Sequence, residues 1–173
     1  SNLKSSAIVY TDGSTSPKGR SPNSGSGIFI TDEQHVPLWS GGLIVRADGN
    51  NFIVELAAAA VVIKACPNDT PLKMKIDSLA TIGALSKGPL SERKRVRAPG
   101  RAWLSFCRSE IGKKQISIEH VYSHTGSLTP EQKGNDAADE MANKYRLQGE
   151  SKGPVPYLVS TEEPLILEFK GSN

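Results

Sequence analysis

The sequence predicts an α/β fold in which a five-stranded mixed sheet is flanked by helices. Three strand-like segments follow one another in the first 45 residues, which is the order of an antiparallel meander. An alanine-rich helix comes next, and from there strands alternate with helices, as in parallel βαβ units. Together the two patterns predict a sheet that contains antiparallel and parallel strand pairs.

The first three strands are predicted from apolar segments that serine, glycine and proline separate. Residues 7–10 (AIVY) are a buried strand that is expected to end at Asp12, where an Asp-Gly pair indicates a turn. Residues 16–27 are rich in serine, glycine and proline and are expected to form a loop. Residues 27–31 and 35–45 supply the second and third strands.

The remaining elements alternate in type. The clearest helix is residues 50–66, with four consecutive alanines at its centre and Pro67 directly after it. Ser78 is a suitable N-cap for a short helix that follows a strand. After the first helix we expect a strand at 72–77, helices at 78–85 and 99–112, a strand at 115–123 and a last helix at 136–146.

The composition fits one intracellular domain with no membrane partner. The chain has 173 residues, 37% of them hydrophobic, and no apolar run reaches the ~18 residues that a membrane helix needs. Cys66 and Cys107 fall in predicted helices, and both are expected to be reduced, buried packing residues. Residues 1–148 are expected to form the domain. Residues 149–173 are rich in proline and are expected to be an appendage or linker.

Positive charge is concentrated in one segment. The whole chain has a net charge of +3, whereas residues 87–114 contain nine basic and two acidic residues. The rest of the chain is therefore net negative. Such a distribution indicates either a solvated basic face or a binding site for a polyanion.

Three acids lie at the ends of predicted strands or near the start of a predicted helix. Asp12 and Asp77 each end a strand, and Glu55 lies near the start of an otherwise apolar helix. Taken singly, they can be a turn residue, a strand-end residue and an acid that is favourable at a helix N-terminus. Strand ends and a helix N-terminus can converge at one edge of an α/β sheet, where three carboxylates would repel one another unless divalent cations neutralise them.

The last predicted helix contains three acids that its phase separates. With about 100° between successive residues, Ala138, Ala142 and their neighbours form the buried stripe. Asp139 lies on the flank of this stripe, whereas Asp136 and Glu140 lie nearly opposite to it. The phase therefore predicts that Asp139 leans toward the sheet and that the other two acids face water.

The four acids lie in four short sequence motifs: YTDGS at 10–14, NNFIVELAAA at 50–59, IDS at 76–78, and HVYSHTGS with GNDAADEMA over 120–142. These motifs resemble those of the type I ribonuclease H family, in particular the ribonuclease H domains attached to retroelement reverse transcriptases. The resemblance covers residues 6–147 and implies a ribonuclease H-like fold. Each motif alone is short, but four acids in this order and in these contexts are specific.

The resemblance also implies which residues act. The family's four metal-binding carboxylates fall on Asp12, Glu55, Asp77 and Asp139, the last because Asn-x-x-x-Asp matches residues 135–139. His124 matches the family's mobile histidine, which assists proton movement or product release. Substrate contacts are implied for Ser14, Asn51, Ser78, Arg93, Arg95, Arg97 and Asn135.

The activity implied by the resemblance is hydrolysis of the RNA strand of an RNA–DNA hybrid. Two Mg²⁺ ions about 3.5–4 Å apart would act there, with Asp12 as the bridging ligand, and Mn²⁺ is expected to substitute. The hybrid would be recognised by its shape and its 2′-hydroxyl groups. An adjoining reverse transcriptase domain in the parent polyprotein is an expected partner.

The chain also departs from the family pattern. The loop between His124 and Asn135 contains SLTPEQKG and is expected to be longer than in bacterial members. Residues 86–101 occupy the region where some members carry a basic handle, but they do not match that handle in detail.

Two other functions fit the same fold. A catalytically silent ribonuclease H-like module would bind or scaffold nucleic acid, but it is expected to have lost one or more of the acids, and all four are present. A junction resolvase or a transposase-type integrase would share the fold. The order Asp, Glu, Asp, Asp with the HTGS and GN motifs disfavours that class.

Overall fold

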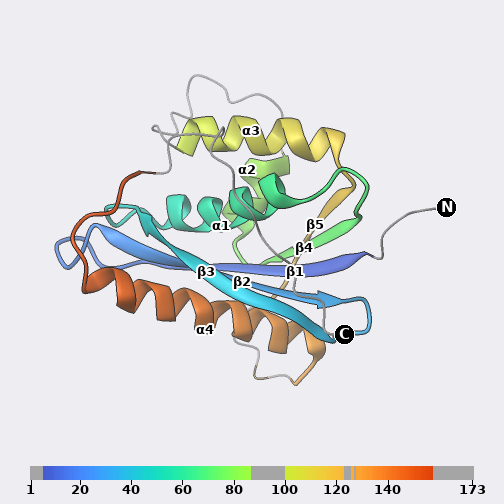
Figure 1. Ribbon diagram of the computed structural model, residues 1–173, viewed down its shortest axis with the longest axis horizontal. Helices are drawn as coiled ribbons and strands as arrows, with labels where there is room; N and C mark the ends of the chain where they lie inside the picture. Colours follow the sequence, from blue (N-terminus) through green and yellow to red (C-terminus); the bar gives the residue numbers. More distant parts are fainter. Residues whose placement is uncertain (1–5, 87–99, 123–125, 127, 158–173) are drawn as a thin grey trace.

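The computed structural model describes residues 6–86, 100–122, 126 and 128–157. Its centre is a five-stranded sheet with the strand order β3-β2-β1-β4-β5 (Figure 1). The strands are β1 (Ala7–Ser14), β2 (Asn23–Asp32), β3 (Pro37–Arg46), β4 (Leu72–Ile76) and β5 (Ile116–His120). The β1–β2 and β2–β3 pairs are antiparallel, whereas β1–β4 and β4–β5 are parallel. The predicted mixed sheet is confirmed.

Helices cover both faces of this sheet. They are α1 (Asn51–Ala65), α2 (Leu79–Ser86), α3 (Gly100–Lys113) and α4 (Pro130–Glu150). The first three lie on one face, and α4 lies alone on the other, where it packs against β1, β2 and β3 (Figure 1). Among the helices of the described residues, none is both long and apolar enough to cross a membrane.

The main core lies between the sheet and α1. Ala58, Ala59 and Ala60 are completely buried, and their small side chains let α1 lie close to β1 and β2. Trp103 of α3 is buried against the same core. The cysteines, one at the end of α1 and one in α3, are free and buried, which confirms the prediction.

On the opposite face, α4 rests directly on two glycines of β2. A Cβ atom at Gly27 would lie 2.0 Å from the carbonyl oxygen of Ala138. A Cβ atom at Gly25 would lie 2.2 Å from the carbonyl oxygen of Ala142 and from the backbone nitrogen of Arg146. Because these are backbone atoms of a helix, they cannot turn aside. The glycines therefore set how closely α4 approaches the sheet.

The predicted boundaries of β1 and β2 are wrong. β1 continues through the Asp-Gly pair to Ser14, because residues 12–14 pair with residues 25–27 of β2. β2 accordingly begins at Asn23, inside the segment that was predicted to be a loop. Its glycines at 25 and 27 are buried because the backbone of α4 lies over them, whereas Ser26 faces α1 and donates a hydrogen bond to the carbonyl oxygen of Val54 at 2.8 Å.

The last helix also begins earlier than predicted. α4 starts at Pro130 rather than at residue 136, and Thr129 caps it by accepting a hydrogen bond from the backbone nitrogen of Gln132 at 3.2 Å. Residues 130–135, predicted to be a long loop, are therefore helical. The predicted domain boundary after residue 148 falls in the last turn of α4.

Residues 151–157 fold back against the start of β2. The buried side chain of Asn23 donates hydrogen bonds to the carbonyl oxygens of Gly149 and Gly153 and accepts one from the backbone nitrogen of Val155, each at 3.0 Å. All three hydrogen bonds fix the backbone that leaves α4. The segment after the helix is thus attached to the sheet.

Candidate metal centre

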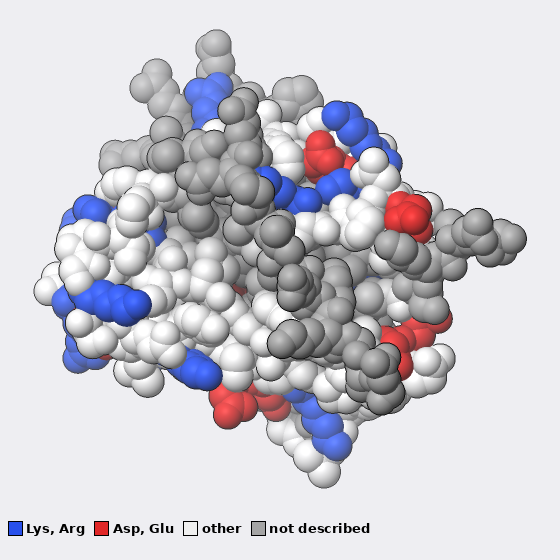
Figure 2. Space-filling view, in the orientation of Figure 1, with Lys and Arg blue, Asp and Glu red and all other residues white. Residues whose placement is uncertain are grey.

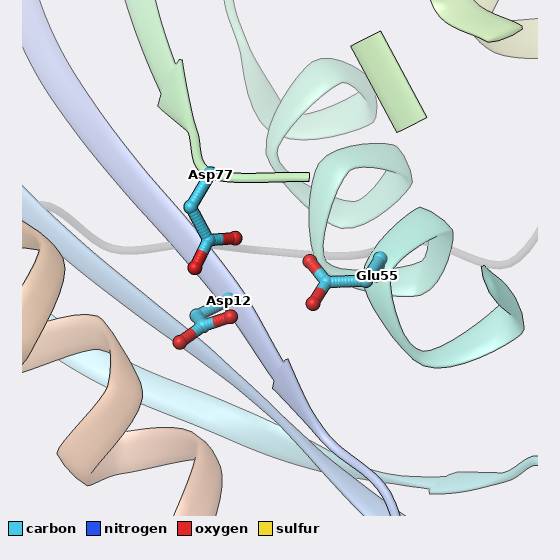
Figure 3. Close-up of side chains that lie close together, drawn as sticks. All are labelled: Asp12, Glu55 and Asp77. Carbon is cyan, nitrogen blue, oxygen red and sulfur yellow. The ribbon is translucent and has the colours of Figure 1, made fainter. Parts of the chain in front are cut away.

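Three carboxylates from three elements meet at one edge of the sheet (Figure 3). Asp12 lies in β1, Asp77 directly follows β4, and Glu55 lies in the second turn of α1. One carboxylate oxygen of each residue lies within 4.8 Å of the others. The convergence that the strand ends predicted is therefore present.

The sheet register places two of these acids side by side. Thr11 of β1 pairs with Ile76 of β4 in the parallel ladder, so the residues that follow them, Asp12 and Asp77, are neighbours. The ring of His120 lies next to them, with its Nε2 atom 3.1 Å from the carbonyl oxygen of Asp77. This contact connects the end of β5 to the backbone that carries the third acid.

The backbone of Gly13 contacts the carboxylates of both Asp12 and Glu55. The backbone N–H of Gly13 donates to Oδ1 of Asp12 at 2.8 Å and to Oε1 of Glu55 at 3.2 Å. A Cβ atom at this position would lie 2.9 Å from the side chain of Val54. Gly13 therefore permits α1 to approach β1 closely enough for one N–H group to contact both carboxylates.

Burial and neighbouring negative charges raise the pKa of two of the acids. Asp12 is 6% exposed and Glu55 is 5% exposed. Loss of hydration, followed by the charges of Glu55 and Asp77, raises the pKa of Asp12 to about 9. Loss of hydration and the charge of Asp77 raise the pKa of Glu55 to about 7. Without a cation, the cluster holds protons that ordinary carboxyl groups would release.

The ligand atoms fit a hard divalent cation. The Oε2 atom of Glu55 is buried and has no hydrogen-bond partner within the described residues. Such an orphaned oxygen is unfavourable unless something binds it. Carboxylate oxygens are the ligands that Mg²⁺ and Mn²⁺ prefer. A divalent cation would both bind this oxygen and neutralise the repulsion among the three acids.

A fourth acid reaches the cluster from α4, which passes beside Asp12 (Figure 3). Asp139 is half-buried, and its hydrogen bond with Asp12 contributes to the raised pKa of Asp12. Asp136 and Glu140 are exposed. The separation of these three acids by helix phase is therefore confirmed.

Three other predicted substrate-contact residues differ in their exposure and in their hydrogen bonds. Ser78 caps α2, because its hydroxyl oxygen accepts a hydrogen bond from the backbone nitrogen of Thr81 at 3.2 Å. Asn51 is exposed at the start of α1, where its Oδ1 atom accepts a hydrogen bond from the hydroxyl of Thr15 at 2.8 Å. Asn135 is 1% exposed, and its Oδ1 atom has no partner among the described residues.

Most of the predicted basic surface is outside the described residues. His124 and the three arginines of the predicted substrate contacts lie there: Arg93, Arg95 and Arg97. At the end of the basic segment, Lys114 forms an ion pair with Glu110 at 3.4 Å and donates to the carbonyl oxygen of Ile63. Figure 2 shows lysine and arginine side chains spread around the rim of one face of the molecule.

Two residues of α4 that the motifs did not identify also connect to the site. Asn143 donates a hydrogen bond to Oδ2 of Asp139 at 3.4 Å. The predicted contact residue Ser14 donates to Oδ1 of Asn143 at 2.7 Å and accepts a hydrogen bond from Nε of Arg146 at 2.8 Å. The spacing of four residues between Asp139 and Asn143 is the only sequence signal of this arrangement.

Solved structures with this fold include cellular and viral proteins. The chain superposes on LC11-RNase H1, isolated from compost by a metagenomic approach, with a TM-score of 0.61 and 18% identity, covering 86% of this chain and 100% of that one. For RNase H1 of Halobacterium salinarum the TM-score is 0.58 at 18% identity, with 80% and 96% covered. For the prototype foamy virus protease-reverse transcriptase it is 0.68 at 18% identity, with 84% of this chain but 21% of the viral chain covered.

The sequence itself gives the remaining comparison. No curated protein matches the chain. A protein-family model described as RNase H matches residues 4–146. This range includes all the acids of the cluster and ends within α4.

Proposed function

The chain belongs to the RNase H family, and from that premise we propose that it is an endonuclease that hydrolyses the RNA strand of RNA–DNA hybrids. The observation that carries the proposal is the cluster of three acids, two of them buried with raised pKa values and one with an orphaned oxygen. The proposed metal ligands are Asp12, Glu55, Asp77 and Asp139. Two Mg²⁺ ions are the proposed cofactor, and Mn²⁺ is expected to substitute.

The protein's part in this reaction is to hold the ligands in place. When bound, two such ions activate a hydroxide and stabilise the leaving oxygen. The N–H group of Gly13 fixes one oxygen each of Asp12 and Glu55, which leaves Oε2 of Glu55 available. His120 contacts the backbone of Asp77. His124 is proposed to assist proton movement or product release.

The proposed substrate is a duplex that is recognised by shape. Ser14, Asn51, Ser78 and Asn135 are the proposed contacts near the acids, and the arginines at 93, 95 and 97 are proposed to bind phosphates. The domain is proposed to work beside a reverse transcriptase domain inside the cell. Its similarity in fold to the foamy virus protease-reverse transcriptase supports that setting.

One comparison of substrates tests this function. The purified protein is incubated with an RNA–DNA hybrid, duplex RNA, duplex DNA and a four-way DNA junction, each with Mg²⁺ and with EDTA. We expect cleavage of the RNA strand of the hybrid only, and only with Mg²⁺. Binding of the hybrid without cleavage would identify a silent scaffold module, and cleavage of the junction would identify a different nuclease class.

The metal ligands are tested by Asp77→Asn, which removes a charge but keeps the shape of the side chain. We expect this variant to fold and to lose cleavage, because a neutral amide is a poor ligand for a hard cation. Asp69→Asn alters an exposed acid in the turn after α1 and is the control, with unchanged activity. Cleavage by Asp77→Asn at the wild-type rate would show that the site is assigned wrongly.

A further inference from the structure

The carboxylate of Asp139 stands at the end of a chain of hydrogen bonds. Asn143 bonds to Asp139, Ser14 bonds to Asn143, and Arg146 bonds to Ser14, with distances of 3.4, 2.7 and 2.8 Å. The chain runs from a positive guanidinium group to a negative carboxylate. It links two turns of α4 to the last residue of β1.

The direction of every bond in this chain is determined. An ionised Asp139 can only accept, so Asn143 must present its NH₂ group to it. The amide oxygen of Asn143 then faces Ser14, whose hydroxyl must donate. That leaves the lone pairs of Ser14 to accept from the N–H group of Arg146, which can only donate. Because the donors and acceptors match throughout, each bond polarises the next toward Asp139.

The far end of the chain is anchored as well. Arg146 forms an ion pair with Glu150, one turn further along α4, at 2.9 Å. The same carboxylate oxygen of Glu150 accepts a hydrogen bond from the hydroxyl of Ser16 at 2.7 Å. Arg146 is therefore held on both sides, by Glu150 and by Ser14, and has little freedom to leave the chain.

The contact between β1 and α4 depends on the glycines of β2. Ser14 pairs with Gly25 in the antiparallel ladder, and Gly25 lies directly beneath the backbone of Ala142 and Arg146. A side chain at this position would lift α4. Ser14 would then lose contact with Asn143 and Arg146. The series of hydrogen bonds from Arg146 to Asp139 therefore requires the close approach of α4 to the sheet.

We propose that Arg146, Ser14 and Asn143 are positioning residues that hold the Asp139 carboxylate toward Asp12 for metal binding. The inference rests on the proposed function, because it takes Asp139 as a metal ligand. Partners that orient a ligating carboxylate change metal affinity when they are removed, by about 10- to 100-fold. The resemblance implies that Ser14 contacts the substrate, whereas this geometry gives its hydroxyl a role inside the protein.

Metal binding without substrate is the decisive measurement. Mn²⁺ is titrated calorimetrically into the wild type and into Asn143→Ala, Ser14→Ala, Ser14→Thr and Lys144→Ala. We expect Asn143→Ala and Ser14→Ala to bind Mn²⁺ about tenfold more weakly than the wild type does. Ser14→Thr keeps the hydroxyl and is expected to bind as the wild type does. Lys144→Ala changes an exposed neighbour and is the control for α4.

A double variant and the kinetics complete the test. The double variant Ser14→Ala with Asn143→Ala is expected to bind Mn²⁺ no more weakly than Asn143→Ala alone, because each substitution interrupts the same series of hydrogen bonds. In cleavage assays of Asn143→Ala, the Mg²⁺ concentration for half-maximal rate is expected to rise while KM for the hybrid stays unchanged. Unchanged Mn²⁺ binding by Asn143→Ala would overturn the proposal, as would a raised KM with normal Mn²⁺ binding in Ser14→Ala. If the wild type binds Mn²⁺ but cleaves no hybrid, the proposed function fails, whereas the titrations still decide the role of the chain.

Discussion

At the scale of single residues, α4 contains two aspartates three positions apart with different surroundings. Asp139 is half-buried beside Asp12, whereas Asp136 is exposed and accepts a hydrogen bond from the side chain of Gln132 at 2.8 Å. Asp139→Asn should reduce kcat and Mn²⁺ affinity at least tenfold, or about 1.4 kcal/mol, because a proposed metal ligand is lost. Asp136→Asn should change either quantity less than about twofold. Rates and calorimetric titrations of both variants check this, and equal effects would contradict it.

How far the sequence predicts these residues depends on the kind of contact. The position of Asp139 follows from helix phase alone, because a helix repeats regularly and Ala138 and Ala142 mark its buried side. Ser14 and Asn143 are different, since their contact joins the two ends of the domain. No local periodicity contains that information. It exists only once the sheet register and the height of α4 above it are known.

At the scale of elements, the joint between β2 and α4 is a contact of backbone with backbone. Gly27→Ala would place a methyl group 2.0 Å from the carbonyl oxygen of Ala138, so α4 must move. We expect a loss of stability of about 3 kcal/mol, at the upper end for overpacked sites. Gly83→Ala in α2 is the matched control, because a Cβ atom there meets nothing within 4 Å. It should stabilise the protein by up to ~1 kcal/mol, since alanine favours helix over glycine.

Urea denaturation of the wild type and both glycine variants measures these changes in the free energy of unfolding. A Gly27→Ala protein as stable as the wild type would show that α4 does not rest on this glycine. Among the four acids, Asp139 lies on the helix that moves, so metal binding should weaken together with stability in this variant alone.

The two elements that meet at this joint, β2 and α4, are among those whose boundaries the sequence predicts poorly. The start of β2 has no apolar residues to mark it, because α4 leaves room only for glycine at 25 and 27, and polar serines alternate with these glycines. The start of α4 does carry a signal. Thr129, Pro130 and Gln132 are in the positions of an N-cap, a first-turn proline and a capping-box residue. The long, regular α1 was predicted to within a residue at each end.

At the scale of the whole molecule, the metal-free protein should become less stable as pH rises. Asp12 and Glu55 have folded-state pKa values of about 9 and about 7, above their ordinary values of 3.8 and 4.5. Between these limits the folded state therefore binds more protons than the unfolded state. Its stability is greatest at the acidic end and falls as pH rises toward about 9. The proposed Mg²⁺ would replace the protons, so it should raise the melting temperature more near pH 8 than near pH 5.

Thermal unfolding at these two pH values, with Mg²⁺ and with EDTA, measures the difference. The variant Asp12→Asn with Glu55→Gln has no titratable protons at these two positions. It should show a flatter dependence on pH and a smaller response to Mg²⁺ than the wild type. An equal Mg²⁺ effect at both pH values in the wild type would mean that the metal does not bind at the buried acids.

The four acids lie in β1, in α1, directly after β4 and in α4, which together span most of the chain. Ligands that are distant in sequence meet only after slow, long-range contacts have formed. A folding intermediate in which α4 has not yet packed on the sheet lacks Asp139 at the cluster and therefore cannot complete the proposed metal site. The proposed nuclease activity would then appear only once α4 has packed on the sheet, and a partly folded intermediate would not cleave nucleic acid.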